Sequence, residues 1–352
     1  MTDKGDEAVR TVNAKRGKIP PASAAFAASV RAGQRRALAR AITLIESTRS
    51  DHRQSAEALL RELLPETGRS VRLGISGVPG VGKSSLIERL GLHIVAAGHK
   101  LAVLPVDPSS PRTGGSILGD KTRMEELSRS ADAYIRPSPA GPTLGGVSRR
   151  TREAVLACEA AGFDVIIVET VGVGQSETAV ADLVDMFVLL LAPGGGDELQ
   201  GIKRGIIELA DALVVTKADG DLAAAAERAR ADYAQAIHLL SPALADWTPP
   251  VLKCSAVTGE GIGDIWTAAE RYRSTVEKSG ALRARRAEQA RAWMWSEVNE
   301  TLMSRLREGR RVDKMVAATE ARVVAGEMTP GEAARTVLDA FASGIKRPGG
   351  DG

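Results

Sequence analysis

The sequence predicts an α/β domain with a mainly parallel, doubly wound sheet, and three observations support this fold class. Short apolar runs alternate with stretches of helical periodicity after Pro65, as expected for strands joined by crossover helices. The first run leads directly into a glycine-rich turn that is followed by a helical pattern. Hydrophobic residues make up 43% of the 352 residues and aromatic residues only 3%, so Ala, Val, Leu and Ile must fill a sizeable core.

The predicted strands are the apolar runs themselves. Each run is rich in Val, Ile or Leu and is short enough for a strand in a compact domain. Runs without polar alternation indicate strands that are buried on both faces, which implies parallel pairing and right-handed crossovers. The six runs span residues 71–76, 100–106, 164–169, 185–192, 211–217 and 250–255.

The sheet domain is expected to carry helical additions at both ends. A polar tail comes first and is predicted to be disordered. Leucine and isoleucine at helical spacing then predict two helices that end at Pro65, and helical periodicity returns after Ala281. The predicted regions are the disordered tail, the N-terminal helical extension, the sheet domain and the C-terminal helical arm, at residues 1–22, 23–66, 67–279 and 280–345.

The C-terminal arm is expected to form a homodimer. An apolar stripe at helical spacing presents area that a closed sheet domain does not need, and symmetric pairing is the common use of such a patch. The arginines that precede the stripe are expected to lie on a solvated linker helix. The stripe is Trp295, Val298, Leu302 and Leu306, and the arginines are Arg283, Arg285, Arg286 and Arg291.

Charge and cysteine content exclude several classes of partner. The 47 Lys and Arg against 44 Asp and Glu give a net charge of +3, which is too weak to indicate nucleic acid or a membrane surface. Cys158 and Cys254 form no CxxC pair, so neither a zinc site nor a disulfide framework is expected. A charged N-terminus and the lack of a long apolar run predict a cytoplasmic protein without a signal peptide or a transmembrane segment.

The strongest motif is a phosphate-binding loop. Residues 77–84 read GVPGVGKS, a complete GxxxxGK[ST] pattern between a predicted strand and a predicted helix. Glycines let backbone N–H groups turn inward around phosphates, and the following helix directs its positive end at them. Lys83 is expected to neutralise the β and γ oxygens and Ser84 to bind Mg²⁺. The predicted nucleotide-binding residues here are Gly77, Val78, Pro79, Gly80, Val81, Gly82, Lys83, Ser84 and Ser85.

Acidic residues at two further strand ends are expected beside the phosphates. Glu169 ends the run VIIV at a position where P-loop nucleotide hydrolases usually carry an Asp, so its extra methylene favours contact with the metal through a water. The N–H of Gly172 can approach the γ-phosphate. Asp107 closes the run LAVLPV and should face the phosphates, because the carboxyl ends of parallel strands form the ligand crevice. The alternative role for Asp107 is a cap on the following turn.

A guanine-reading motif follows a later strand. The run Thr216-Lys217-Ala218-Asp219 matches the [NT]KxD pattern of GTPases. A carboxylate at position 219 can accept both N1–H and N2–H₂ of guanine, whereas adenine would present a lone pair to it. Lys217 would lie across the base plane, and Thr216 stands where an Asn more often braces the phosphate loop, with a shorter reach. A loop whose backbone N–H would contact guanine O6 comes later, at Ser255, Ala256 and Val257.

Together these motifs resemble the MeaB/ArgK family, GTPases that attend adenosylcobalamin-dependent methylmalonyl-CoA mutase. The similarity covers nearly the whole chain. Its most specific stretches are AVLPVDPSSPRTGGSILGDKTRM and DVIIVETVGVGQSE, supported by GVPGVGKSSLIE and GGGDELQGIKRGIIELAD. The resemblance implies a P-loop NTPase G domain that binds GTP and GDP with Mg²⁺, hydrolyses GTP, and acts as a chaperone and switch for cofactor loading and protection of the mutase.

The resemblance also implies roles for individual residues. Segments near residues 107–123, 170–178 and 194–203 would respond to the nucleotide state, and Gln200 and Lys203 would relay it to the mutase. The C-terminal helices would join a homodimer. The residues implied in hydrolysis are Lys83, Asp107, Asp120 and Glu169, and those implied in metal binding are Ser84, Asp107, Asp120 and Glu169.

Two other functions fit parts of the sequence. A phosphotransferase of the arginine/ornithine transport kinase type could use the same nucleotide site, but it needs an acceptor pocket with a base, and Asp107 is the sole candidate. Nickel-inserting GTPases of the urease or hydrogenase type share the architecture but carry His-rich or Cys/His metal ligands, whereas this chain has four scattered His and two distant Cys. No glutamine follows residues 169–172 at the position where small signalling GTPases orient water, since Gln175 lies three residues further on, so we expect slow basal hydrolysis that a partner accelerates.

Overall fold

The structure is a computed structural model that describes most of the chain in two compact units. Residues up to Gln289 belong to the first unit and residues from Ala290 to the second. The predicted tail, most of the segments expected to respond to nucleotide, and the site residues Asp107, Asp120 and Gly172 lie outside the described residues. The described residues are 24–47, 49–106, 124–136, 144–170, 180–194, 204–238, 244, 246–308 and 310–344.

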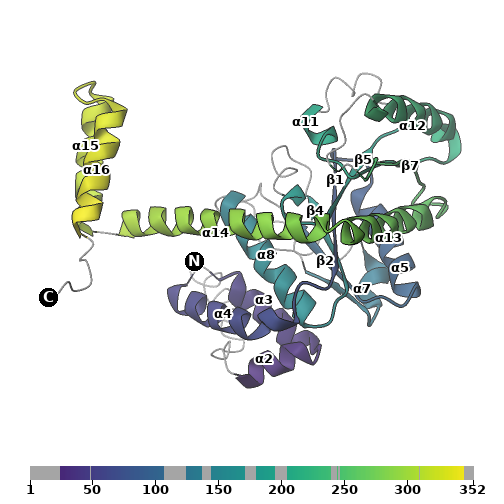
Figure 1. Ribbon diagram of the computed structural model, residues 1–352, viewed down its shortest axis with the longest axis horizontal. Helices are drawn as coiled ribbons and strands as arrows, with labels where there is room; N and C mark the ends of the chain where they lie inside the picture. Colours follow the sequence, from purple (N-terminus) through teal and green to yellow (C-terminus); the bar gives the residue numbers. More distant parts are fainter. Residues whose placement is uncertain are drawn as a thin grey trace, which may run out of the picture. The chain divides into compact units, whose positions relative to one another are not determined.

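A seven-stranded parallel sheet forms the centre of the first unit, which confirms the predicted fold class (Figure 1). All six predicted strands are present with both bounds within two residues of those expected, and the last two strands each end two residues early. Strand β3 was not predicted, because three residues at a sheet edge are too few to show a periodicity. The strands are β1 (Val71–Gly77), β2 (Leu101–Val106), β3 (Ala133–Ile135), β4 (Val165–Thr170), β5 (Met186–Leu191), β6 (Ala212–Val215) and β7 (Val251–Lys253).

The strand order places β1 at the middle of the sheet. The order is β3-β2-β4-β1-β5-β6-β7, so β1 pairs with β4 on one side and with β5 on the other. The chain therefore winds outward in one direction from β1 through β2 and in the other direction from β5. In such sheets the carboxyl ends beside the reversal point form the ligand crevice. The loop that follows β1 opens at this point.

Helices cover both faces of the sheet, and they were expected from the alternating pattern (Figure 1). On one face α5 and α13 pack together, and α8 lies on the other face with the N-terminal helices against it. The helices of the first unit are α2 (Ala24–Arg31), α3 (Arg35–Ile45), α4 (Ser50–Leu63), α5 (Lys83–Ala96), α7 (Glu125–Arg129), α8 (Leu144–Ala160), α11 (Arg204–Ile207), α12 (Ala223–His238), α13 (Ile262–Lys278) and the start of α14 (Ala281–Glu308), with short 3₁₀ turns η1 (Leu64–Glu66) and η2 (Gly220–Leu222).

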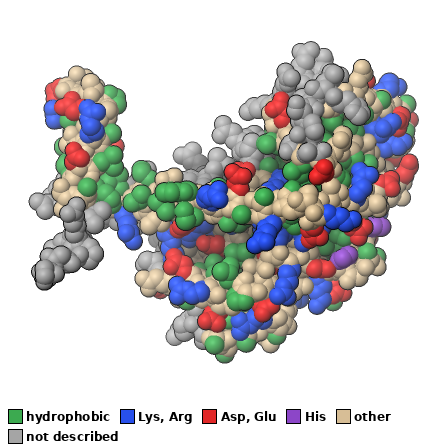
Figure 2. Space-filling view, in the orientation of Figure 1, with side chains coloured by type: hydrophobic (Ala, Val, Ile, Leu, Met, Phe, Trp, Pro, Cys, Tyr) green, Lys and Arg blue, Asp and Glu red, His purple; other side chains and the backbone are tan. Residues whose placement is uncertain are grey.

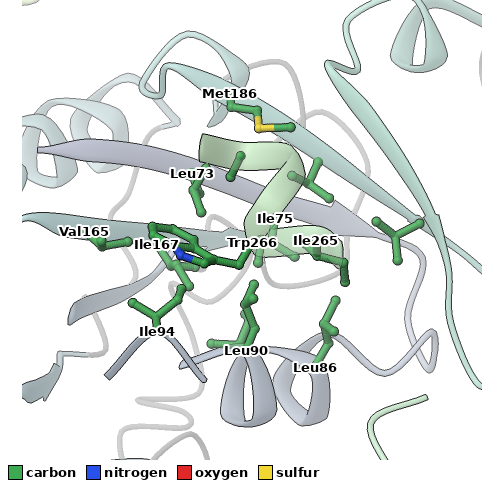
Figure 3. Packing of buried hydrophobic residues seen from close by; sticks show 14 of the residues in the cluster. Leu73, Ile75, Leu86, Leu90, Ile94, Val165, Ile167, Met186, Ile265 and Trp266 are labelled. Carbon is green, nitrogen blue, oxygen red and sulfur yellow. The ribbon is translucent and has the colours of Figure 1, made fainter. Parts of the chain in front are cut away.

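A buried aliphatic layer joins the central strands to α5 and α13 (Figure 3). Alternate residues of β1, such as Leu73 and Ile75, meet Leu86 and Leu90 of α5, while Trp266 of α13 lies between these groups. Burial of side chains of this size contributes roughly 1.5–3 kcal/mol each. The layer fixes α5, whose first residues are Lys83 and Ser84, against the centre of the sheet.

The N-terminal extension contains three helices rather than the two that were predicted. Ala32, Gly33 and Gln34 separate α2 from α3, and Gly33 has a φ of 69°, which a helix cannot include. The apolar spacing continues through this break, and for that reason the periodicity alone did not reveal it. The three helices pack on one another and on α8.

A buried ionic network at the amino ends of the strands corrects another expectation. Asp185, just before β5, is 2% exposed and accepts hydrogen bonds from Arg286 at 2.8 Å to Oδ1 and 2.6 Å to Oδ2. The backbone N–H of Arg72 donates to the same carboxylate at 3.0 Å. Arg285 donates to the Oδ2 of Asp211 at 3.1 Å. The expectation that Arg285 and Arg286 lie on a solvated linker helix is therefore wrong.

This network sets where the first unit ends. The side-chain amide of Gln289 donates to the carbonyl of Val184 at 2.8 Å, so the first turns of α14 belong with the sheet. The predicted boundary between residues 279 and 280 falls in the turn between α13 and α14. A truncation that keeps the first unit whole should therefore cut after Gln289.

The second unit consists of the remainder of α14 together with α15 (Arg310–Val324) and α16 (Pro330–Gly344), which pack on each other. Several large apolar side chains of α14 are exposed, and hydrophobic surface is visible along this helix (Figure 2). Trp295 is 58% exposed and Leu302 is 46% exposed. Of the predicted stripe, Trp295, Val298 and Leu302 are therefore exposed in the single chain, whereas Leu306 is half-buried. Among the described helices, none is both long enough and apolar enough to cross a membrane.

The Asp185 contacts lead to a stability prediction. Arg286→Met should lower the free energy of unfolding by about 3 kcal/mol, because the buried Asp185 carboxylate loses its two-point partner and keeps only the more distant Arg273, at 3.7 Å, as a cation. Arg283→Met is the control, since it removes an exposed arginine from the same helix and should cost less than about 0.5 kcal/mol. Urea unfolding followed by circular dichroism measures both variants. Equal, small losses in the two variants would contradict this role of Arg286.

Candidate nucleotide-binding site

The phosphate-binding loop connects β1 to α5, as the sequence predicted. Gly77 ends the strand, and a Cβ atom there would lie 2.7 Å from the carbonyl oxygen of Leu190, so no larger residue fits. Gly82 precedes α5 with a φ of 99°, a left-handed conformation that residues with a side chain rarely adopt. These two glycines explain why the chain can turn this tightly between a buried strand and a helix.

Backbone N–H groups of the loop form a ready anion site. Among the described residues, the N–H groups of Gly80, Gly82, Ser84 and Ser85 have no acceptor. They gather at the amino end of α5, where the helix dipole adds partial positive charge. Such a group of convergent N–H donors binds phosphate oxygens. The arrangement supports the predicted contacts of residues 77–85 with a nucleotide.

Lys83 lies inside the same loop. Its ammonium donates to the carbonyl of Gly77 at 2.7 Å and to that of Val78 at 3.1 Å. The side chain thus folds back over the first residues of the loop instead of extending into solvent. A phosphate held by the N–H donors of the loop would meet this ammonium directly. This placement fits the charge-neutralising role that the motif predicts.

Two of the residues predicted to bind metal are in contact. The hydroxyl of Ser84 donates to Oε1 of Glu169 at 3.1 Å, and Glu169 is 3% exposed at the end of β4. A hydroxyl and a carboxylate are hard oxygen ligands, so this pair fits Mg²⁺. Within the described residues there is no cluster of three or more His, Cys, Asp or Glu side chains that could hold a metal. Nucleotide phosphates and water usually complete a magnesium site of this kind.

The remaining predicted acidic ligands cannot be placed side by side with this pair. Asp107 and Asp120 lie outside the described residues, as does Gly172. The last described residue before Asp107 is Val106, which pairs with Thr170, the neighbour of Glu169. The end of β2 is therefore adjacent to the end of β4 at the carboxyl edge of the sheet. The roles of Asp107 and Asp120 stay predictions.

Thr216 braces the phosphate loop. Its hydroxyl oxygen lies 2.6 Å from the carbonyl oxygen of Val81 and 3.2 Å from that of Leu191, and the residue is 4% exposed. A Thr was expected to reach less far than the usual Asn. The hydroxyl nevertheless reaches the loop, because β6 lies next to β5 and brings Thr216 close to Val81.

The guanine-reading segment has an unusual backbone. Lys217 has a φ of 54°, the one positive value among the described residues other than glycine. Non-glycine residues in this conformation store about 1–3 kcal/mol of strain and often mark functional sites. The next residue, Ala218, donates its N–H to the carbonyl of Cys254 at 3.0 Å. This bond joins the Lys217–Asp219 segment to the loop after β7.

The loop after β7 keeps one amide open. The N–H groups of residues 254, 255 and 257 to 260 all have acceptors, whereas that of Ala256 has none among the described residues. Ser255 contributes half of these acceptors: its hydroxyl accepts from the N–H groups of Val257 and Thr258 at 3.1 Å each, and its carbonyl accepts from the N–H of Gly259. Of the three residues that the motif offers for guanine O6, Ala256 is therefore the one whose N–H is open among the described residues.

One contact of this loop has no sequence signal. Arg89 of α5 donates its Nε–H to the carbonyl of Ala256 at 3.0 Å, across 167 positions of sequence. A single arginine on a helix face matches no motif, so this contact was not predicted. Cys254 in the same loop is 1% exposed, and burial raises the pKa of its thiol to about 12, which excludes a thiolate at neutral pH.

Comparison with known proteins identifies relatives along most of the chain. Residues 38–311 match the family model described as methylmalonyl Co-A mutase-associated GTPase MeaB. A Caulobacter vibrioides relative is 59% identical over 310 residues, covering 88% of this chain and 95% of that protein. The mouse methylmalonic aciduria type A homolog, a mitochondrial protein, is 49% identical over 321 residues, covering 88% of this chain and 77% of that protein. A crystal structure of a LAO/AO transport system kinase is 37% identical with a TM-score of 0.72, covering 91% of this chain and 97% of that one.

Thr216 provides a direct test of the brace. Thr216→Val keeps the shape of the side chain but removes the hydroxyl, so the buried carbonyl of Val81 loses its donor. We expect GDP to bind about tenfold more weakly, because an unsatisfied carbonyl costs about 1–3 kcal/mol. Thr216→Ser retains the hydroxyl and should bind GDP nearly as well as the unaltered protein. Isothermal titration calorimetry measures the three affinities, and equal affinities in all of them would rule out the brace.

Proposed function

The chain belongs to the MeaB family of methylmalonyl-CoA mutase-associated GTPases, and on this premise we propose that it is a Mg²⁺-dependent switch and chaperone for an adenosylcobalamin-dependent methylmalonyl-CoA mutase. In this role the protein would assist loading of the cofactor and protect the mutase. The observation that carries the nucleotide chemistry is the contact of Ser84 with Glu169 beside the open N–H groups of the loop. That contact supports the proposal because a hydroxyl and a carboxylate, both ligands that suit Mg²⁺, lie together at the start of the helix that follows the loop.

The residues divide the work of GTP hydrolysis among themselves. The loop N–H groups and Lys83 bind the phosphates and stabilise the negative charge that develops as the γ-phosphoryl group leaves. Ser84 and Glu169 would hold Mg²⁺, which neutralises charge on the β and γ oxygens when it is bound. Asp107 and Asp120 are proposed to lie around the ion and the attacking water, and Gly172 to sense the γ-phosphate.

Guanine would be selected by residues of the two segments that follow β6 and β7. The carboxylate of Asp219 would accept N1–H and N2–H₂ of guanine, while the open N–H of Ala256 would donate to O6. Lys217 would cover one face of the base with its aliphatic stem. These contacts require the base and the phosphates to be held at one fixed separation. The bond from Thr216 to Val81 supplies that constraint.

The partner proposal rests on the relatives. The family description names the mutase, and the mouse relative is named for methylmalonic aciduria. The proposed arm interface joins two copies of this chain, since the exposed apolar residues of α14 favour a self-complementary contact. A cytoplasmic location is part of the same proposal.

The decisive experiment uses the methylmalonyl-CoA mutase encoded by the same genome. We expect this mutase to raise the rate of GTP hydrolysis at least about tenfold, because partners of slow GTPases commonly complete the site. We also expect the mutase to lose activity more slowly during turnover when the chain and GTP are present. Lys83→Ala is the control variant and should abolish both effects.

The same assay separates the proposal from a phosphotransferase. With GTP labelled at the γ-phosphate, a switch GTPase releases all label as inorganic phosphate even when arginine and ornithine are added. Label on either amino acid would favour the kinase alternative, which the name of the related transport system kinase suggests. The chaperone proposal would be refuted if the mutase did not change the rate of GTP hydrolysis and if the chain with GTP did not slow the loss of mutase activity.

A further inference from the structure

We propose that Arg89 is a positioning residue that sets how strongly the protein recognises O6 of guanine, an inference that rests on the proposed binding of the base at Asp219 and Ala256. Arg89 belongs to α5, the helix that begins at the phosphate loop, and it donates to the carbonyl of Ala256 at 3.0 Å. It is therefore a direct link between the phosphate helix and the base loop. None of the motifs includes it.

The peptide group after Ala256 is held at both ends. Its carbonyl accepts from the Nε–H of Arg89 at 3.0 Å, and its N–H, which belongs to Val257, donates to the Ser255 hydroxyl at 3.1 Å. A planar peptide with both groups bonded has little freedom to rotate. This fixes one side of Ala256.

The peptide group before Ala256 is held at one end only. Its carbonyl, which belongs to Ser255, accepts from the N–H of Gly259 at 2.9 Å, within the turn. In a trans peptide the N–H points opposite to the carbonyl. The N–H of Ala256 therefore points away from the turn, and no described residue accepts from it. The direction of this N–H depends on both neighbouring peptide groups, and Arg89 restrains one of them.

The position of Arg89 on α5 makes a direct phosphate contact a poor explanation. Arg89 follows Lys83 by six residues, which is about 9 Å farther along the helix axis. Its guanidinium reaches the base loop instead, through Nε. Since α5 also carries Lys83 and Ser84, the bond to Ala256 relates the O6 donor to the phosphate site through a single rigid helix. A guanine nucleotide spans these two points.

The test pairs two substitutions that separate hydrogen bonding from charge. In Arg89→Gln the amide nitrogen occupies the place of Nε in the side chain, so the donor is kept and the charge is lost. In Arg89→Met a stem of similar length remains without a donor. Arg61→Met, which removes an exposed arginine on α4, controls for the loss of positive charge alone.

Calorimetry with GDP and 6-thio-GDP provides the readout. The thio compound keeps N1–H and N2–H₂ for Asp219 but replaces O6 by sulfur, a weak acceptor. We expect Arg89→Met to weaken GDP binding about fivefold, which corresponds to one net hydrogen bond, and to weaken 6-thio-GDP binding less than about twofold. Arg89→Gln should restore GDP binding to within about twofold of the unaltered protein, and Arg61→Met should change neither affinity.

Three outcomes would overturn the inference. Arg89→Met could leave GDP binding unchanged, it could weaken both nucleotides equally, or Arg89→Gln could fail to restore binding. ADP is included as a separate check on the proposed function. If the unaltered protein binds ADP as tightly as GDP, the assignment of the base site itself fails. If the unaltered protein prefers GDP and Arg89→Met binds GDP with the same affinity, the base site stands and only the role of Arg89 is refuted.

Discussion

A hydrogen bond of 2.6 Å between the Thr216 hydroxyl and the Val81 carbonyl joins the two halves of the nucleotide site. The phosphate half lies on β1 and α5, and the base half lies after β6 and β7. Parallel strand pairing brings these ends to one edge of the sheet but does not fix loops that extend beyond it. Because both partners are buried, the bond works in a low-dielectric setting where losing it is costly. The bond from Ala218 to Cys254 then extends the connection to the last loop.

Polar groups at the amino ends of the strands and at the carboxyl ends of the strands are satisfied in opposite ways. At the amino ends of the strands, buried charges are paired within the protein, as in the contacts of Asp185 with Arg286 and of Arg72 with Glu159. Burial raises the pKa of the Asp211 carboxyl, and the neighbouring Arg285 guanidinium opposes that rise. At the carboxyl ends, the N–H groups of Gly80, Gly82, Ser84 and Ser85 in the phosphate loop and that of Ala256 are left open among the described residues. Unpaired donors are tolerable there because a ligand can satisfy them.

Features that depend on local pattern could be predicted from the sequence. The six apolar runs indicated their strands because a strand buried on both faces is a short run of Val, Ile and Leu without alternating polar residues. The phosphate loop and the Thr216–Asp219 segment could be predicted because glycines, a lysine and an acid at fixed spacing follow strand ends. The edge strand β3 could not be predicted because three residues are too few to show a periodicity, and the break at Gly33 could not because apolar residues continue on both sides of it.

Contacts between segments that are far apart in the chain could not be predicted from the sequence. Arg286 looks like any helix-surface arginine until Asp185, 101 positions earlier, is found at the start of a central strand. Arg89 and Ala256 are likewise far apart in sequence, and the reach of Thr216 depends on how closely β5 and β6 approach. Propensity and periodicity describe one segment at a time, whereas these interactions depend on the spatial order of strands.

A crystal structure of the protein with GDP and Mg²⁺ would decide whether the two halves act as one guanine-nucleotide site. We expect the β-phosphate within the loop of residues 77–85, N1 and N2 of guanine on the Asp219 carboxylate, and O6 about 2.7–3.2 Å from the N–H of Ala256. We also expect the Thr216 hydroxyl to stay on the Val81 carbonyl. A nucleotide whose phosphates occupy the loop while its base lies away from Asp219 and Ala256 would show that the two halves do not form one site.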